Sequence, residues 1–386
     1  MNYWHMQMHP NDKDDWTNDD IAEILKSELI GCSGDPISVF DKLEIGDIVL
    51  VRHKEKSAIA LTKVLEKSRN TLENEKTDFV WFDRCVKVEV LAWYENEKIS
   101  GRFFFPITIA SVSDVSAFEY IRNLYQKTQI KKQMQNYLNL LTQKHQIILQ
   151  GAPGTGKTRL AQMIADELIK NGGETALIQF HPAYSYEDFV RGIVAETNQN
   201  GQISYNVKNK ILCEIAEKAI NDKDTKYVLI IDEINRANLP AVLGELIYAL
   251  EYRDKPVNSL YELNGKKEFT LPSNLYIIGT MNTADRSVGH IDYAIRRRFA
   301  FVSVPANKSI ITNLKALELF EKIEKIFTDN LSSDFQREDI MIGHSYFLVE
   351  KEEDLAMRLE YEIKPLLREY VKDGILTCDI ATINQL

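Results

Sequence analysis

The 386-residue sequence has few cysteines, no excess of positive charge and no long apolar run. Cys32, Cys85, Cys213 and Cys378 lie far apart without a CxxC pair, which argues against a zinc site and a disulfide framework. The longest apolar runs, such as 227–231, are strand-sized, whereas a membrane span needs roughly 20 residues. The acidic start does not resemble a basic, apolar secretory signal, so we expect a cytoplasmic protein with no membrane segment.

The charge balance limits the ways in which this chain can contact nucleic acid. Its net charge is −10 at pH 7, and residues 1–122 hold 15 Lys and Arg against 22 Asp and Glu. Nonspecific DNA binding by a globally basic surface is therefore excluded, and any contact with nucleic acid must be local. The hydrophobic content of 44% supports real cores, and the length predicts two or three domains.

Four segments follow one another along the chain. Residues 1–115 alternate short strand-like runs with turn signals, which predicts a small β-barrel-like domain with a helix near 18–29. Residues 116–145 have helical spacing and predict a linker helix. Residues 146–306 alternate strand-length apolar runs with helical segments, which predicts an α/β core with a parallel sheet and flanking helices. Residues 307–386 predict a helical lid. The strand-like runs of the first segment are 48–52, 58–64, 86–93 and 102–109.

A complete phosphate-binding loop, or P-loop, follows the first apolar run of the α/β core. Residues 147–150 lead into the sequence GAPGTGKT at 151–158, which a helical pattern follows directly. Glycines let backbone N–H groups approach phosphates, while Lys157 reaches the β and γ phosphates and Thr158 ligates Mg²⁺. The predicted nucleotide-binding residues are Gly151, Pro153, Gly154, Thr155, Gly156, Lys157 and Thr158.

Two later apolar runs also end in polar side chains. The run 228–231 ends in Asp232 and Glu233, and in a P-loop protein such a pair gives one carboxylate to Mg²⁺ and one to the attacking water. We assign Asp232 to the metal and Glu233 to the water. The run 276–279 is followed by Thr-Met-Asn282, and an amide at the tip of a strand between the two motif strands can sense the γ-phosphate. The alternative for Asn282 is that it caps the following loop.

A helical run at 290–299 carries three arginines, Arg296, Arg297 and Arg298, near its C-terminus. Such cations can simply complement the helix dipole on a solvated face. Alternatively, one or more of them points across a subunit boundary and stabilises transition-state charge on the neighbouring subunit's nucleotide. Both interpretations stay open, and a ring-shaped assembly would favour the second, for which Arg297 and Arg298 are the candidates.

Four segments resemble the motor subunit of McrBC-type modified-DNA restriction systems, within a match that runs from about residue 147 to 370. They are FHPAYSYEDFVRG (180–192), DEINRANLPAVLGELIYALE (232–251), GTMNTADRSVGHIDYAIRRRF (279–299) and GHSYF (343–347). MNTADRS discriminates much better than any P-loop. In that family an Asn and an Arg follow the acidic pair, and Asn235 and Arg236 match them. The resemblance also implies that Asn282, Asp285 and Arg286 contact nucleotide, water or the adjoining subunit.

The same resemblance implies an AAA+ P-loop NTPase that hydrolyses GTP, forms hexameric rings and works with a nuclease subunit of the McrC type. The sequence has no NKxD-like guanine clamp, so the preference for GTP rests on the resemblance alone, and a related ATP-using motor is the alternative. It also has no PD-(D/E)xK arrangement in a strand context. We therefore expect DNA cleavage to belong to a partner.

The first segment resembles the PUA-like barrels of the EVE type, through residues 3–4, 40–50 and 58–64. Those barrels hold a flipped, modified base in an aromatic pocket, which implies DNA with a modified base as the ligand. Trp4 and Trp81 are the candidate stacking residues, and core packing is the alternative for each.

Two other classes of function compete with a restriction motor. One is a MoxR-like AAA+ protein remodeller whose front domain binds protein, and the MNTADRS signature weighs against it. The other is a binding module with a degenerate nucleotide site, and the intact set of Lys157, Asp232, Glu233 and Asn282 weighs against that.

Overall fold

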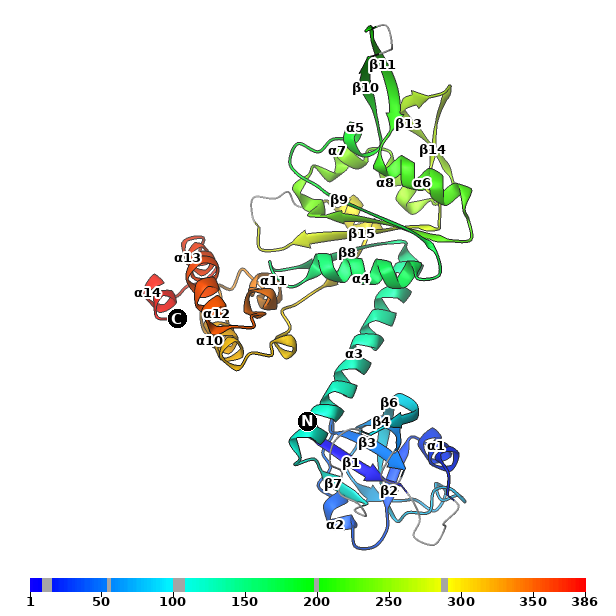
Figure 1. Ribbon diagram of the computed structural model, residues 1–386, viewed down its shortest axis with the longest axis vertical. Helices are drawn as coiled ribbons and strands as arrows, with labels where there is room; N and C mark the ends of the chain where they lie inside the picture. Colours follow the sequence, from blue (N-terminus) through cyan, green and yellow to red (C-terminus); the bar gives the residue numbers. More distant parts are fainter. Residues whose placement is uncertain (9–15, 54–56, 100–107, 198–200, 286–290) are drawn as a thin grey trace. The chain divides into compact units, whose positions relative to one another are not determined.

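The computed structural model describes residues 1–386 except 9–15, 54–56, 100–107, 198–200 and 286–290. It divides into two compact units, an N-terminal unit of residues 1–135 and a C-terminal unit of residues 136–386 (Figure 1). The division falls within the long helix α3 (Val115–Lys144), in the region where the sequence predicts a linker helix over 116–145. Within the described ranges, no helix is both long enough and apolar enough to span a membrane.

The N-terminal unit is built on seven strands. They are β1 (Tyr3–Gln7), β2 (Leu29–Cys32), β3 (Ile48–His53), β4 (Ser57–Val64), β5 (Arg69–Asn70), β6 (Arg84–Lys98) and β7 (Ile109–Ser111). Their order is β2-β6-β4-β3-β1-β7, with β5 paired to β6. The β1–β3 pair is parallel, and the other pairs are antiparallel. Two helices, α1 (Asn18–Lys26) and α2 (Ile37–Phe40), complete the unit.

Three of the four strand-like runs expected here are strands, because β3, β4 and β6 contain them. Most of the fourth run, 102–109, lies outside the described residues. The pairing also differs from a closed barrel, since no described strand pair joins β2 to β7. The described strands therefore follow an open path that begins at β2 and ends at β7.

The C-terminal unit begins with a five-stranded parallel sheet, which confirms the predicted α/β fold. Its strands are β8 (Gln146–Gly151), β9 (Gly173–Gln179), β12 (Lys226–Asp232), β15 (Leu275–Asn282) and β16 (Ala300–Ser303), in the order β16-β8-β15-β12-β9. The residues 228–231 of β12 are all buried. Continuous apolar runs of this kind arise because helices cover both faces of a parallel sheet.

The flanking helices pack on both faces of that sheet (Figure 1). Helix α4 (Lys157–Ile169) lies on one face, and α6 (Ile211–Asn221) lies on the other. The remaining helices of the core are α5 (Tyr186–Phe189), η1 (Ile234–Arg236), α7 (Leu239–Leu243), α8 (Leu246–Glu251) and α9 (Tyr293–Arg298).

Two antiparallel hairpins extend from the core on the same side as α6 (Figure 1). The first pairs β10 (Arg191–Thr197) with β11 (Ile203–Asn209), and the second pairs β13 (Pro256–Leu263) with β14 (Lys266–Thr270). The sequence pattern did not predict these hairpins. Most of their side chains are exposed or only partly buried, so no buried face imposes a strong apolar pattern on the strands.

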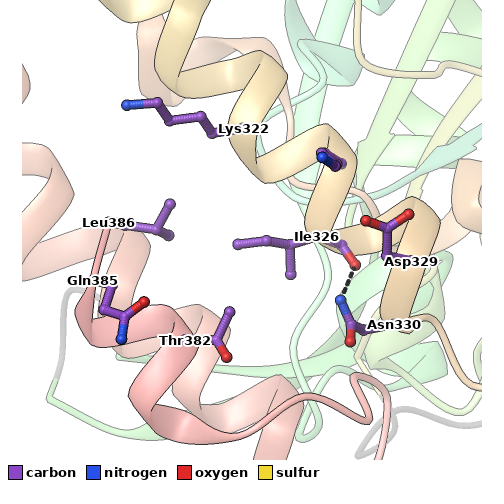
Figure 2. Close-up of a pocket in the computed structure, with 8 residues that line it drawn as sticks. Lys322, Ile326, Asp329, Asn330, Thr382, Gln385 and Leu386 are labelled. Atoms are coloured by element: carbon purple, nitrogen blue, oxygen red, sulfur yellow. Dashed lines mark hydrogen bonds between the residues drawn. The ribbon is translucent and has the colours of Figure 1, made fainter.

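A helical lid follows the sheet, as predicted. It contains α10 (Leu314–Asn330), α11 (Arg337–Ile340), α12 (Glu352–Arg358), α13 (Lys364–Lys372) and α14 (Ile380–Asn384), with short helices η2 (Lys308–Ile310), η3 (His344–Phe347) and η4 (Leu359–Ile363). Phe320, Phe327 and Phe347 belong to its own apolar core. Figure 2 shows a groove between α10 and α14, where the Asn330 side chain donates to the carbonyl of Ile326 at 3.1 Å. None of the predicted site residues lines this groove.

Candidate active site

Three neighbouring strands bring the predicted site residues to one edge of the sheet. In parallel strands the carboxyl ends lie together, which is where α/β proteins place their ligands. Strand β15 lies between β8 and β12, as expected for the strand that ends in Asn282. Asn282 is in register with Gly151, the last residue of β8, while Asp232 ends β12 on the other side.

The phosphate loop surrounds the ammonium group of Lys157. Helix α4 begins at Lys157, with Gly156 as its N-cap in the left-handed region at φ 81°. The Lys157 side chain is buried, and its Nζ donates to the carbonyl oxygens of Gly151 (3.0 Å) and Ala152 (2.8 Å). It also donates to Oδ1 of Asn282 at 2.6 Å. The loop and the tip of β15 are therefore joined through one charged side chain.

The two predicted metal-binding residues are hydrogen bonded to each other. The Thr158 hydroxyl donates to Oδ1 of Asp232 at 2.7 Å. Thr280 donates to the same carboxylate oxygen at 2.5 Å and accepts the backbone N–H of Glu233 at 3.2 Å. A hydroxyl and a carboxylate at the edge of a phosphate loop are the oxygen ligands that suit Mg²⁺, so these residues fit the predicted metal.

Thr280 is a further residue of the candidate site, and none of the sequence motifs indicated it. It is 1% exposed, and its hydroxyl connects Asp232 to the backbone of Glu233. The sequence does contain a signal for Thr280. Side chains two residues apart on a strand point to the same face, and Thr280 stands two residues before Asn282, so both are expected on one face of the strand.

Glu233 adopts a left-handed backbone conformation with φ 53°, which is unusual for a residue other than glycine. Its Oε1 accepts a hydrogen bond from Nδ2 of Asn282, and Arg236 Nε contacts its Oε2 at 3.4 Å. Asn282 therefore contacts both Lys157 and Glu233 through its side chain. The Asn282 side chain thus joins the phosphate loop to the acidic pair, which fits the sensor interpretation better than the loop-cap alternative.

The residues implied by the family resemblance lie around this cluster. Asn235 is 6% exposed and donates from Nδ2 to the backbone carbonyl of Asn282 at 3.3 Å. Arg236 contacts Oδ2 of Asp285 at 3.2 Å. Arg286 lies outside the described residues.

The arginines of α9 have different surroundings. The Arg297 side chain is 67% exposed and that of Arg298 is 10% exposed, and both contact Oε2 of Glu251, at 3.0 and 2.8 Å. The Arg296 guanidinium lies 5.0 Å from the centre of the Phe301 ring. Because Arg298 is nearly buried beside Glu251, it is suited to a contact within its own subunit. Arg297 is more exposed and is therefore the better candidate for contacting the nucleotide of a neighbouring subunit.

Of the two tryptophans predicted to stack on a base, Trp4 is only 5% exposed and belongs to the apolar core of the N-terminal unit. Its indole N–H donates to Oδ2 of Asp47 at 2.8 Å. This environment fits the core-packing alternative for Trp4. Trp81 is half-buried and meets the Phe82 ring edge-on, with ring centres 5.9 Å apart.

The GHSYF segment of the lid contacts the phosphate loop, and the sequence did not indicate this contact. The backbone N–H of Gly343 donates to the carbonyl of Pro153 at 2.9 Å, and that of Ser345 donates to the carbonyl of Gly154 at 3.0 Å. A Cβ at Gly343 would lie 1.9 Å from the carbonyl carbon of Gly154, so this crossing of two backbones requires glycine. The GHSYF segment therefore packs directly on the phosphate loop.

The environment of Lys157 makes nucleotide binding sensitive to protons. Burial lowers the pKa of Lys157 to about 8, although Glu233 and Asp232 partly oppose this shift. A bound phosphate favours the protonated amine, so binding at pH 8 should take up protons and weaken as the pH rises further. Isothermal titration in buffers of different ionisation enthalpy measures this uptake. Lys157→Arg is the control because arginine stays protonated, and equal uptake by both proteins would assign the proton to another group.

Comparison with known proteins agrees with this geometry. Residues 146–299 match the family described as AAA domain (dynein-related subfamily). The sheet, the phosphate loop and the lid thus define an AAA+ P-loop NTPase fold. Residues 318–377 match the family described as McrB, alpha-helical lid domain. The lid region of this chain is therefore similar to the lid of McrB proteins.

Two curated relatives are similar to the chain over this region. The Type IV methyl-directed restriction enzyme EcoKMcrB subunit of Escherichia coli strain K12 is 36% identical over 268 residues, which cover 62% of this chain and 57% of that protein. The Type II restriction enzyme BsuMI component YdiS of Bacillus subtilis strain 168 is 30% identical over 190 residues, which cover 40% of this chain and 55% of that protein. The chain thus spans little more than half the length of each.

Proposed function

We propose that this chain is the motor subunit of a McrBC-like restriction system, which hydrolyses GTP and drives a partner nuclease on modified DNA. The observation that carries the proposal is the hydrogen-bonded cluster of Lys157, Asn282 and Glu233 at the strand ends of an AAA domain with a McrB-like lid. A degenerate nucleotide site would not need a buried cation, an amide and a carboxylate in contact.

The proposed chemistry assigns each of these groups a task. The N–H groups of the loop and the Lys157 ammonium would bind the phosphates, and Thr158 with Asp232 would hold Mg²⁺, which would supply positive charge to neutralise the phosphates. Glu233 polarises the attacking water, and Asn282 positions the Glu233 carboxylate through its amide. Asn235 supports the Asn282 backbone, while Asp285 and Arg286 contact nucleotide, water or the adjoining subunit.

The remaining parts of the proposal rest on the family resemblance. GTP is the proposed substrate, a hexameric ring the proposed assembly, and a McrC-like nuclease in the same cytoplasm the proposed partner. Residues 1–115 are the proposed EVE/PUA-like reader of a modified base, residues 116–145 the linker, residues 146–306 the motor core and residues 307–386 the lid. The Escherichia coli relative is a methyl-directed enzyme, which supports methylated DNA as the first ligand to test.

The test combines the purified chain with a McrC-like nuclease and matched DNA duplexes that differ only in cytosine methylation. We expect hydrolysis of GTP to exceed that of ATP, the nuclease to raise the turnover, and cleavage to require GTP and the methylated duplex. Hydrolysis of ATP alone would contradict the base preference. If adding the nuclease does not change the turnover, and if the chain binds methylated and unmethylated DNA equally, the restriction function is contradicted. The protein-remodelling alternative is then favoured.

A further inference from the structure

The lid places one imidazole beside the phosphate loop. His344 begins η3 and is 9% exposed. Its two sequence neighbours, Gly343 and Ser345, each donate a backbone hydrogen bond to the loop, to the carbonyls of Pro153 and Gly154. Because the backbone is tied to the loop on both sides of His344, the position of the imidazole relative to the loop is fixed.

The hydrogen bonding of His344 determines which ring nitrogen carries the proton. Nδ1 accepts the backbone N–H of Asn307 at 3.1 Å. Burial and the positive charge of Arg159 lower the pKa of His344 below its usual value, so the ring is neutral at pH 7. A neutral imidazole whose Nδ1 is an acceptor holds its proton on Nε2, and that N–H is a donor.

The Nε2 donor lies next to the start of α4. It stands 3.6 Å from the position that a Cβ on Gly156 would occupy. Gly156 is the N-cap of α4, and the first N–H groups of that helix are those proposed to bind phosphate. Among the described residues, the hydrogen bond recorded for this ring is the one that Nδ1 accepts from Asn307, so Nε2 is available to a ligand. The lid thus places an available donor beside a proposed phosphate site.

We propose that His344 is a nucleotide-binding residue of the lid, which donates its Nε2–H to a phosphate oxygen of the bound nucleotide. This inference rests on the proposed function, because it assumes that the loop binds a nucleotide. It adds a contact from the lid to a site whose other phosphate ligands all come from the AAA core. Neutral donors of this kind form strong hydrogen bonds to charged phosphate oxygens.

Two substitutions separate the two sides of the ring. In His344→Asn the amide oxygen can replace Nδ1 as the acceptor for Asn307, but nothing replaces the Nε2–H. In His344→Gln the amide N–H can replace the Nε2–H, but the Nδ1 acceptor is lost. We expect His344→Asn to weaken binding of fluorescent GDP and ADP with Mg²⁺ about tenfold or more with little change in melting temperature, as for loss of a hydrogen bond to a charged group. His344→Gln should bind nearly as the unsubstituted chain does and melt at a lower temperature.

Lys157→Ala distinguishes the failure of this inference from the failure of the proposed function. If the unsubstituted chain binds neither nucleotide, or binds them as Lys157→Ala does, the proposed nucleotide site is wrong. If the unsubstituted chain binds and Lys157→Ala does not, the site stands and His344 is tested separately. Unchanged affinity in His344→Asn, or loss of affinity in His344→Gln, then overturns the assignment, since the latter would show that His344 acts only through Asn307.

Discussion

Replacing Glu233 with Gln should lower the hydrolytic turnover about 10²- to 10⁴-fold while nucleotide affinity stays close to that of the unsubstituted chain. The amide has nearly the shape of the carboxylate, so it can still accept the hydrogen bond from Nδ2 of Asn282. It cannot accept a proton from water. Because Glu233 already has a left-handed backbone, a substitution that preserves the side-chain length avoids a further change at this strained position.

The measurement is the turnover at saturating nucleotide, together with a binding titration on the same protein. Glu167→Gln is a matched control, since Glu167 lies on α4 itself with an exposed side chain that, among the described residues, forms an ion pair with Lys170. We expect that control to keep both turnover and affinity. Normal turnover in Glu233→Gln would show that another group polarises the water.

Arg297→Ala should lower hydrolysis about 10³-fold or more if this arginine stabilises the transition state on a neighbouring subunit. The Arg297 side chain is 67% exposed, and Glu251 is its ion-pair partner in the described part of its own chain. A long, accessible cation on α9 can reach a second copy, whereas Arg298 is nearly buried. Hydrolysis by the unsubstituted chain should then rise with protein concentration, because each complete site needs two subunits.

Mixing two inactive variants tests the same idea without relying on one substitution. An Arg297→Ala subunit keeps its phosphate loop, and a Lys157→Ala subunit keeps its arginine. An equal mixture should recover activity at about one quarter of the interfaces if subunits assemble head to tail at random. Arg296→Ala is the control, since its guanidinium packs on Phe301, and it should stay active. If turnover per subunit does not change with protein concentration, and if mixing the two variants restores no activity, the whole site lies within one subunit.

The sequence predicted the parallel sheet and most of the strand-end cluster for a physical reason. A strand that is buried on both faces must be apolar throughout, as residues 228–231 are, so the polar residue that ends it stands out. Asp232, Glu233 and Asn282 were recognised in this way. In the structure, Asn282 contacts both Lys157 and Glu233. A sequence motif identifies such residues one by one and does not indicate which of them contact each other.

Other features depend on contacts between distant parts of the chain, and local patterns do not encode these. The crossing of Gly154 and Gly343 joins residues far apart in sequence, and a lone glycine gives no sign of its partner. The family resemblance drew attention to the GHSYF segment but did not indicate where it packs. For Trp4, composition could not decide between stacking and core packing, and the bond to buried Asp47 favours the core.

The crossing of the lid and the phosphate loop has a kinetic consequence. Two backbone hydrogen bonds, to the carbonyls of Pro153 and Gly154, hold the lid on the loop, and any outward swing of the lid must break both. Opening of the lid and loosening of the loop therefore share one barrier. For the proposed hydrolysis, we expect release of the product nucleotide to require this opening, so that a ligand on the outer surface of the lid changes the release rate without contacting a phosphate.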